Sequence, residues 1–253
     1  MQLYDAIFYR KSTKKFSKNR VSIPMFDEIK NICEKTEILK GEMEVKVHPI
    51  LKGDSLKFII KKHSRVVAPH YLLITSKTPE DAECYLENIG YVGEDMVLKL
   101  TELGLATCWI GDSFNKVSVN DFVILEEEEI PVALIAFGFP EKDKQLFRQE
   151  GDKLDRKKIK DIAKNVDEKW LNPVECVRLA PSYKNDQPWK FYQNNGRLDL
   201  YIKKNKHEDI NKINTGIALK HFEIGCQHNN IDFKYEDLQL KKKLSRNYYI
   251  SII

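Results

Sequence analysis

The chain carries one pattern twice, at positions 126 residues apart, which is about half of its 253 residues. Asn88-Ile-Gly90 opens a predicted amphipathic helix, and Asn214-Thr-Gly216 opens a second one at that offset. Apolar positions recur along both helices, although the last of three matched pairs is not apolar in both. These pairs are Met96 with Phe222, Leu100 with Cys226, and Leu103 with Asn229.

A repeat of this length predicts a chain built from two related halves. A predicted strand precedes each helix, within residues 66–75 in the first half and at Arg197–Ile202 in the second. Chance similarity between two amphipathic helices is the alternative explanation. The matched glycines, the preceding strands and the half-chain spacing favour duplication, and we predict halves at residues 1–165 and 166–253.

Other elements of the first half are marked by capping residues and apolar runs. Leu3, Ala6 and Ile7 at helical spacing predict a helix before Arg10, and Ser22 with Pro24 predicts the start of a second helix that continues to Cys33. A long helix is expected over residues 88–103, ending at Gly104. Residues 106–111 are expected to lead into a loop, and residues 130–140 read as a buried strand that ends at Pro140.

Composition excludes several classes of protein. The chain is 42% hydrophobic and 32% charged, as globular domains are, and its apolar run at residues 131–137 is too short to span a bilayer. A net charge of +4 is mild, so no nucleic-acid or membrane partner is expected. The five scattered cysteines indicate reduced thiols and a cytoplasmic location, and neither they nor the six histidines form a metal-binding motif.

The first candidate site is the segment RKSTKKF, residues 10–16, which holds four cations and two hydroxyls directly after a helix. One interpretation is a solvated basic turn, which on its own is the better one. The other is a phosphate site, because a guanidinium offers a planar fork of donors, ammonium groups add charge and Ser12 adds a hydroxyl.

The second candidate is RLAPSYKNDQPWKFY, residues 178–192, which is too rich in prolines for a helix and unusually rich in side-chain amides. Pro181 and Pro188 fix the backbone locally, while Asn185 and Gln187 each offer a donor and an acceptor. Such groups suit a neutral ligand with a polar edge. The alternative is a turn whose Trp189 docks in the core.

The third candidate is GLATCWIG with the following Asp112, residues 104–112. Glycines at both ends allow backbone N–H groups to approach a flat ligand closely. Taken alone this evidence is weak, because Cys108 and Trp109 also suit a protein core.

Together the three segments resemble a known family. RKSTKKF is similar to the N-terminal phosphate signature of the FMN-dependent nitroreductases, GLATCWIG to the segment that meets flavin N5, and APSYKNDQPWKF to their APSxxNxQPW signature. The resemblance extends over nearly the whole chain and is strongest to the TM-type branch, in which two nitroreductase-like halves are fused. It implies an α+β fold with antiparallel or mixed sheets flanked by helices, and two halves that form an intrachain pseudo-dimer.

The resemblance also implies which residues bind FMN. Members of the family usually form homodimers in which one subunit supplies the basic signature and the other supplies PSxxNxQPW. The phosphate and pyrimidine edge would be bound by Arg10, Lys11, Ser12 and Lys14, with Arg156 added to the phosphate cluster. Ile110, Gly111 and Asp112 would border N5, and the other side would be lined by Pro181, Ser182, Tyr183, Asn185 and Gln187.

This sequence departs from the homodimer pattern in each half. The first half has residues 36–43 where a PSxxNxQPW segment is expected, and the second has residues 167–172 where a basic signature is expected. Each half has kept what the other lost. We therefore predict one composite FMN site, one FMN per chain and a monomer with an internal pseudo-two-fold axis.

The activity that the resemblance implies is oxidoreductase chemistry. NAD(P)H would reduce the flavin at N5 and leave, and an electron-poor small molecule such as a nitroaromatic or a quinone would then take its place in a ping-pong cycle. Since no GxGxxG follows a predicted strand, NAD(P)H is expected as a transient donor. A flavin-binding or flavin-sensing protein without turnover is the alternative, and a basic interaction protein is a third possibility.

Overall fold

The computed structural model describes residues 1–253 except 62–63, 65, 78–83, 144–145, 150 and 244. The chain forms two compact units, Met1–Asp152 and Lys153–Ile253, which we call unit 1 and unit 2. They divide the chain earlier than the halves expected at 1–165 and 166–253. That expectation concerns the limits of the repeat and stays a prediction.

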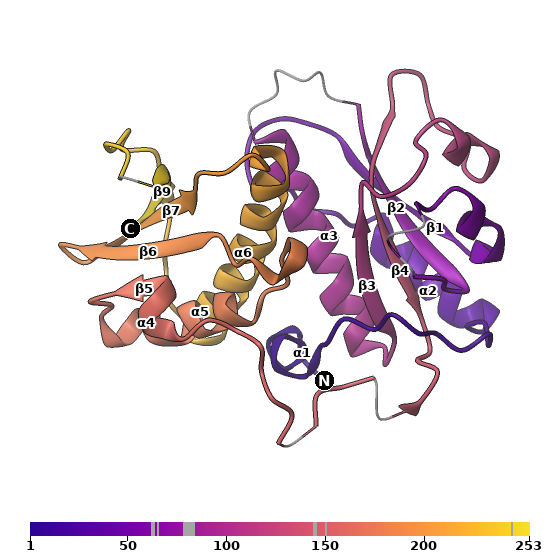
Figure 1. The fold of residues 1–253 in the computed structure, drawn as a ribbon, viewed down its shortest axis with the longest axis horizontal. Coiled ribbons are helices and arrows are strands. Elements are labelled where there is room, and N and C mark those ends of the chain that lie inside the picture. Colours follow the sequence, from indigo (N-terminus) through magenta and orange to yellow (C-terminus); the bar gives the residue numbers. More distant parts are fainter. Residues whose placement is uncertain (62–63, 65, 78–83, 144–145, 150, 244) are drawn as a thin grey trace. The chain divides into compact units, whose positions relative to one another are not determined.

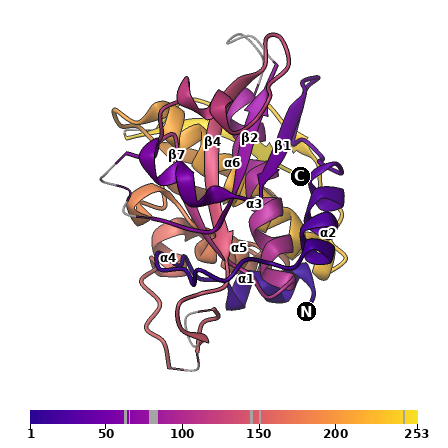
Figure 2. The ribbon, with the colours of Figure 1, turned by 90° about the vertical axis from the view of Figure 1, so that its right-hand side faces the viewer.

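Unit 1 is built around a four-stranded antiparallel sheet with strand order β1-β2-β4-β3 (Figure 1). Its strands β1, β2 and β4 lie alongside one another in Figure 2. The strands are β1 (Val45–Ile50), β2 (His70–Ser76), β3 (Ala106–Gly111) and β4 (Ile130–Gly138). The helices are α1 (Leu3–Tyr9), α2 (Ile23–Cys33) and α3 (Tyr85–Glu102), with 3₁₀ turns at Gly53–Phe58 and Ser118–Asp121.

The helices of unit 1 begin and end largely where capping chemistry predicts. The Ser22 side chain accepts a hydrogen bond from the Met25 N–H at 3.4 Å, and Pro24 lies in the first turn of α2. After α3, Gly104 adopts a φ of +74°, which is the left-handed conformation that ends many helices. These three predictions are confirmed.

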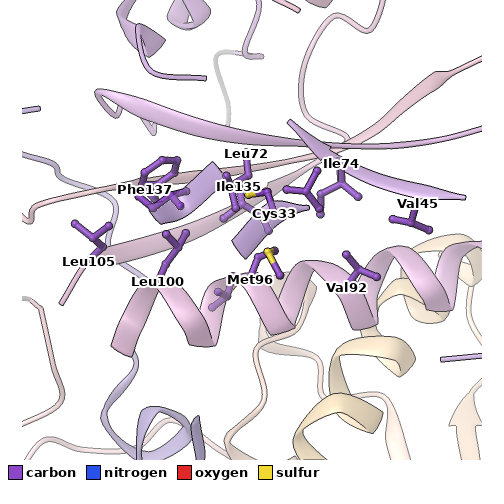
Figure 3. Packing of buried hydrophobic residues seen from close by; sticks show 14 of the residues in the cluster. Cys33, Val45, Leu72, Ile74, Val92, Met96, Leu100, Leu105, Ile135 and Phe137 are labelled. Atoms are coloured by element: carbon purple, nitrogen blue, oxygen red, sulfur yellow. The ribbon is translucent and has the colours of Figure 1, made fainter. Parts of the chain in front are cut away.

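The sheet of unit 1 is covered on both faces, which explains why every residue of β2 is buried. Leu72 and Ile74 face the cluster formed with α2 and α3, while Tyr71 and Leu73 face the 3₁₀ turns. Figure 3 shows the first of these layers, with Met96 and Leu100 of α3 beneath the strands.

Unit 2 contains a five-stranded sheet with strand order β5-β6-β7-β9-β8. The short β5 runs parallel to β6, and the other pairs are antiparallel. The strands are β5 (Ala163–Lys164), β6 (Trp189–Asn194), β7 (Arg197–Lys203), β8 (Tyr235–Glu236) and β9 (Arg246–Ile252). The helices are α4 (Ile159–Ile162), α5 (Glu168–Leu179) and α6 (Glu208–His228), with a 3₁₀ turn at Tyr183–Asn185.

The two sheets share one connectivity. Helix, strand, strand, long helix and two strands follow in both units, and β6-β7-β9-β8 repeats the order β1-β2-β4-β3. Two of the three pairs matched in the sequence also agree in burial, because Met96, Leu100, Phe222 and Cys226 are all buried. The third pair differs, since Leu103 is half-buried and Asn229 is exposed. The predicted α+β class and the internal repeat are therefore confirmed.

Several predicted limits differ from the observed ones. Strand β2 begins at His70 rather than at residue 66, because Pro69 has no N–H for the ladder. Helix α6 begins at Glu208 rather than at Asn214, and Glu208 and Asp209 favour the positive end of the helix dipole. Residues 106–111 form a strand rather than a loop entry, and α5 was not predicted.

Candidate functional site

The basic segment of unit 1 lies beside β3. Directly after α1, Arg10 pairs with Phe147 in an antiparallel bridge, and Ser12 pairs with Thr107 of β3 in a parallel bridge. The Thr13 N–H donates to the Thr107 carbonyl at 2.9 Å. The structure thus brings the first and third candidate segments together, although they are about ninety residues apart in the sequence.

Arg10 is a buried cation with unused hydrogen-bonding capacity. Its side chain is only 2% exposed, and burial lowers the pKa of its guanidinium while the Glu94 carboxylate opposes that change. One Nη donates to Ser12 Oγ at 3.4 Å, but Nε has no hydrogen-bond partner within the described part of the chain. A buried N–H without a partner is costly, and its presence here is consistent with an anion that it would contact.

Glu94 supports this arrangement from α3. It is fully buried, and its Oε2 accepts a hydrogen bond of 2.8 Å from Trp109 Nε1 of β3. Gly93 allows the Trp109 ring to lie close to the helix, because an added Cβ would come within 2.2 Å of that ring. The sequence-based prediction missed Glu94, although a carboxylate within the apolar stretch of a predicted helix is a signal for a buried functional group.

Two further cations of the segment interact with neighbouring residues of unit 1. Lys11 forms an ion pair of 3.6 Å with Asp152, and Lys14 lies close enough to Cys108 to influence its thiol. Burial raises the pKa of Cys108, and Lys14 and Arg10 oppose that rise. Cys108 is therefore a protonated, buried thiol rather than a reactive thiolate.

The end of β3 holds the residues predicted to border the flavin ring. Ile110 lies at an irregularity in the pairing with β4, and Gly111 adopts a φ of +62°. A Cβ added at Gly111 would meet nothing within 4 Å, so one side of the backbone is open, and Asp112 follows it in a turn. From Thr107 to Gly111 the strand covers about 13 Å, which suits a ligand with a charged group at one end and a ring at the other.

The other predicted site residues lie in unit 2, in the loop at residues 180–188 that joins α5 to β6. Asn214 of α6 accepts a hydrogen bond of 3.0 Å from the Tyr183 N–H, and Ser182 Oγ accepts one of 2.9 Å from the Gln187 N–H. The side chain of Tyr183 is 42% exposed, and Pro181 is buried. Trp189 is fully buried, as the structural interpretation of this segment predicted.

The amides of Asn185 and Gln187 are bound within unit 2. Arg156 Nη1 donates to Asn185 Oδ1 at 2.7 Å, and Asn185 Nδ2 donates to the Asp155 carbonyl at 2.7 Å. The Lys157 N–H donates to Gln187 Oε1 at 2.9 Å. Arg156 therefore lies beside the amide loop, and Lys157, which the sequence-based prediction did not single out, contacts it as well.

The predicted residues thus form one group in each unit. In unit 1 they are Arg10, Lys11, Ser12, Lys14, Ile110, Gly111 and Asp112, and in unit 2 they are Arg156, Pro181, Ser182, Tyr183, Asn185 and Gln187. Their role in binding a flavin stays a prediction.

Among the described residues, no group of three histidine, cysteine, aspartate or glutamate side chains is arranged to hold a metal ion. Within the same residues, no helix is both long and apolar enough to cross a membrane.

Comparison with known proteins identifies the class. The family model described as "Putative TM nitroreductase" matches residues 2–226. The chain therefore belongs to this nitroreductase family, and the predicted family and nitroreductase-like fold are confirmed. No curated protein matches the chain.

Two solved structures, from Thermotoga maritima and Clostridium acetobutylicum, share this fold. A putative nitroreductase from Thermotoga maritima aligns with a TM-score of 0.64 at 20% identity and covers 100% of this chain and 94% of its own. A putative NADH oxidase from Clostridium acetobutylicum aligns with a TM-score of 0.50 at 14% identity and covers 66% of this chain and 100% of its own. An FMN-dependent nitroreductase from Clostridium difficile R20291 aligns with a TM-score of 0.47 at 17% identity and covers 62% of this chain and 96% of its own.

Proposed function

We propose that this protein is an FMN-dependent NAD(P)H oxidoreductase that reduces electron-poor small molecules such as nitroaromatics or quinones. The observation that carries the proposal is the buried Arg10, whose Nε lacks a partner among the described residues, beside a strand that ends at the open Gly111. Family membership over residues 2–226 supports the same class of activity.

The residues of unit 1 fit FMN by their chemistry. Arg10, Lys11 and Lys14 offer positive charge and Ser12 offers a hydroxyl, which together suit a phosphate. Ile110, Gly111 and Asp112 offer backbone groups at the other end of β3 for a ring edge. In unit 2, Arg156 adds a cation, while Pro181, Ser182, Tyr183, Asn185 and Gln187 would shape the second side of the site, as the family resemblance implies.

When bound, FMN supplies the ring nitrogen that accepts a hydride from NAD(P)H and later passes reducing equivalents to the acceptor. The protein's part is to bind and orient. Arg10 holds the charged end, Glu94 keeps the Arg10 guanidinium in place electrostatically, and the turn at Gly111 leaves the backbone accessible. No side chain is assigned as a general acid or base.

Stoichiometry, assembly and location follow as parts of this proposal. Only unit 1 carries the basic segment and only unit 2 the amide loop, which supports one FMN per chain and a monomer. The five cysteines are free thiols, which supports a cytoplasmic location. A small-molecule acceptor is the proposed partner, with neither nucleic acid nor membrane.

The direct test is to release any flavin by denaturation, identify it and measure its ratio to protein. Protein-bound FMN should bleach when NADH or NADPH is added without oxygen and recover its colour with a quinone or a nitroaromatic. One FMN per chain with both colour changes supports the proposal. A flavin that stays oxidised in excess NADH and NADPH supports the binding or sensing alternative instead, and a protein that binds no flavin contradicts both.

A substitution tests the phosphate assignment. Arg10→Gln removes the charge but keeps a polar side chain, and loss of a charge-assisted hydrogen bond of roughly 1.5–3 kcal/mol should weaken FMN binding by about 10- to 150-fold. The exposed Lys242→Ala is the control, with unchanged affinity expected. Flavin fluorescence titration gives both values, and equal affinities would refute the role of Arg10.

A further inference from the structure

The loop at residues 180–188 has an unusual backbone. Lys184, Asn185 and Gln187 have φ values of 50°, 57° and 45°, although none of them is glycine. Left-handed conformations are unfavourable for residues with a Cβ, and they persist only where surrounding contacts enforce them. Contacts with other parts of unit 2 must therefore hold this loop in place.

One short segment supplies most of these bonds. The side chains and backbone of residues 155–157 reach Asn185 and Gln187 at distances of 2.7–2.9 Å. In addition, Lys157 Nζ donates to the carbonyls of Asp186 at 2.6 Å and Gln187 at 2.9 Å. We call residues 155–157 the clamp.

Further contacts fix both ends of the loop. Arg246 Nη1 donates to the Pro188 carbonyl at 2.7 Å, and Lys203 pairs with Asp186 at 2.9 Å. At the other end, Asn214 holds the Tyr183 N–H. The loop is thus bound by side chains from β7, α6, β9 and the clamp, all within unit 2.

The clamp occupies the amides that the sequence offered for a ligand. Gln187 is 2% exposed, its Oε1 accepts from the Lys157 N–H, and its Nε2 donates to Asn185. Both polar atoms of the Asn185 side chain also have partners in unit 2. A ligand would have to displace these bonds to reach either amide directly.

We propose that Asn185 and Gln187 of the loop and Lys157 of the clamp are positioning residues. The bonds between loop and clamp hold the loop in its left-handed conformation. In this conformation the loop presents Ser182 and Tyr183 to the ligand. This inference rests on the proposed function for the identity of the ligand, FMN. In this proposal the side-chain amides of Asn185 and Gln187 do not bond to the flavin directly. They bond within unit 2 and fix the shape of the loop before the flavin binds.

Unit 1 contains a matched control. Its loop at residues 36–43, between α2 and β1, takes the equivalent place in the connectivity. It is held by Asn88, the counterpart of Asn214: Asn88 Oδ1 accepts from the Leu39 and Lys40 N–H groups at 2.8 and 3.1 Å. Lys40 and Lys184 are both exposed, so trypsin can report on each loop separately.

The experiment measures tryptic cleavage after Lys184 and after Lys40 in flavin-free protein, with the peptides followed by mass spectrometry. Asn185→Ala, Gln187→Ala and Lys157→Met should each speed cleavage after Lys184 by about tenfold, as a loss of about 1.4 kcal/mol of local stability would produce. Cleavage after Lys40 should not change. Asn88→Ala should show the opposite pattern. Faster cleavage at both sites in one variant would indicate that this variant unfolds generally, and the other two loop variants then provide the test.

A second readout is the FMN dissociation constant from flavin fluorescence. Lys157 is not among the predicted ligand contacts. Even so, Lys157→Met should raise the FMN dissociation constant by about the same factor as it speeds cleavage after Lys184. Lys157→Arg should bring both values most of the way back to those of the wild type. Unchanged cleavage after Lys184 together with weaker FMN binding in Asn185→Ala and Gln187→Ala would overturn the inference in favour of direct contacts. If the wild-type protein binds no FMN, the proposed function fails, while the cleavage pattern still decides how the loop is held.

Discussion

Units 1 and 2 share a connectivity but use their long helices differently. In unit 1, α3 packs mainly on the sheet, with Met96 and Leu100 against strands β2 and β4 (Figure 3). In unit 2, α6 packs most extensively along α5, where an added Cβ on Gly225 would lie 2.7 Å from Pro173 Cα. The two units thus share the order of their elements but differ in the packing between them.

The loops that follow α2 and α5 show the same divergence. Both are anchored by an asparagine near the start of the long helix, Asn88 or Asn214. In the first loop Gly41 takes the left-handed position with a φ of 80°, whereas the second has three non-glycine residues in that region. A loop that keeps such residues depends on contacts from elsewhere in its unit, as loops that form binding sites often do.

The largest expected effect concerns the two close-packed glycines. Gly225→Ala forces its Cβ against the backbone of α5, and Gly93→Ala forces it to 2.2 Å from the Trp109 ring. Overpacking of this kind costs roughly 1–3 kcal/mol, and Gly225→Ala should cost more because a helix backbone has to move. Urea unfolding measures the loss of stability in both variants. A larger loss in Gly93→Ala than in Gly225→Ala would contradict the contrast between helix–helix and helix–sheet packing.

A smaller effect concerns the way in which unit 1 anchors α2. His70 of β2 accepts from the Val21 N–H at 3.0 Å, and its Nδ1 lies 2.6 Å from the Leu51 carbonyl, so the neutral ring satisfies both groups. Burial lowers the pKa of His70 from its usual 6.5. Its contribution to stability is therefore complete above pH 6.5 and is lost as the pH falls through the folded-state pKa.

Stability measured by urea at a series of pH values should show this loss in the wild type. In His70→Gln the free energy of unfolding should depend less on pH between about 5 and 7, because the titrating ring is gone. Equal slopes in the two proteins would show that the anchor does not titrate as expected. Unit 2 has Gly196 at the repeat-equivalent position and so lacks this anchor.

The smallest effect concerns the exposed ion pairs of unit 1. The Lys46 and Lys77 ammonium groups contact the Glu126 carboxylate and lower its pKa to about 2. The contribution of these ion pairs to stability is complete above pH 4.5, the usual pKa of a glutamate, and is lost as the pH falls toward about 2. Glu126→Gln should be slightly less stable than wild type at pH 7, with the difference vanishing in acid; a constant difference would point to another cause.

The residues of the candidate site could be proposed from the sequence because their signals are local. A run of cations after a helix, a glycine-flanked strand and a segment rich in amides are each visible within a dozen residues. The sequence also predicted helix limits at Ser22 and Gly104, since capping depends on the residues at the helix end. Family membership followed from these segments together.

The contacts of the site could not be predicted in the same way. Glu94 interacts with Arg10 from a helix that is remote in the sequence, and although its place in an apolar stretch signals a buried carboxylate, that signal does not identify Arg10 as its partner. Similarly, the amides of Asn185 and Gln187 are bonded to residues 155–157, a segment that no pattern near residues 185–187 identifies as their partner. Hydrogen bonds between distant segments depend on the packing of whole elements, which no short pattern encodes.

By itself, then, the sequence determined that the chain has two related halves, each with a strand followed by a long helix, and that its polar segments fall into a basic and an amide-rich group. These properties depend on periodicity, capping and composition, which act over a few residues. Only the tertiary structure decided that β3 lies beside the basic segment and that Asn185 is bound by Arg156. Such pairings are selected by burial and by the requirement that buried polar groups find partners, and both arise only once the chain has folded.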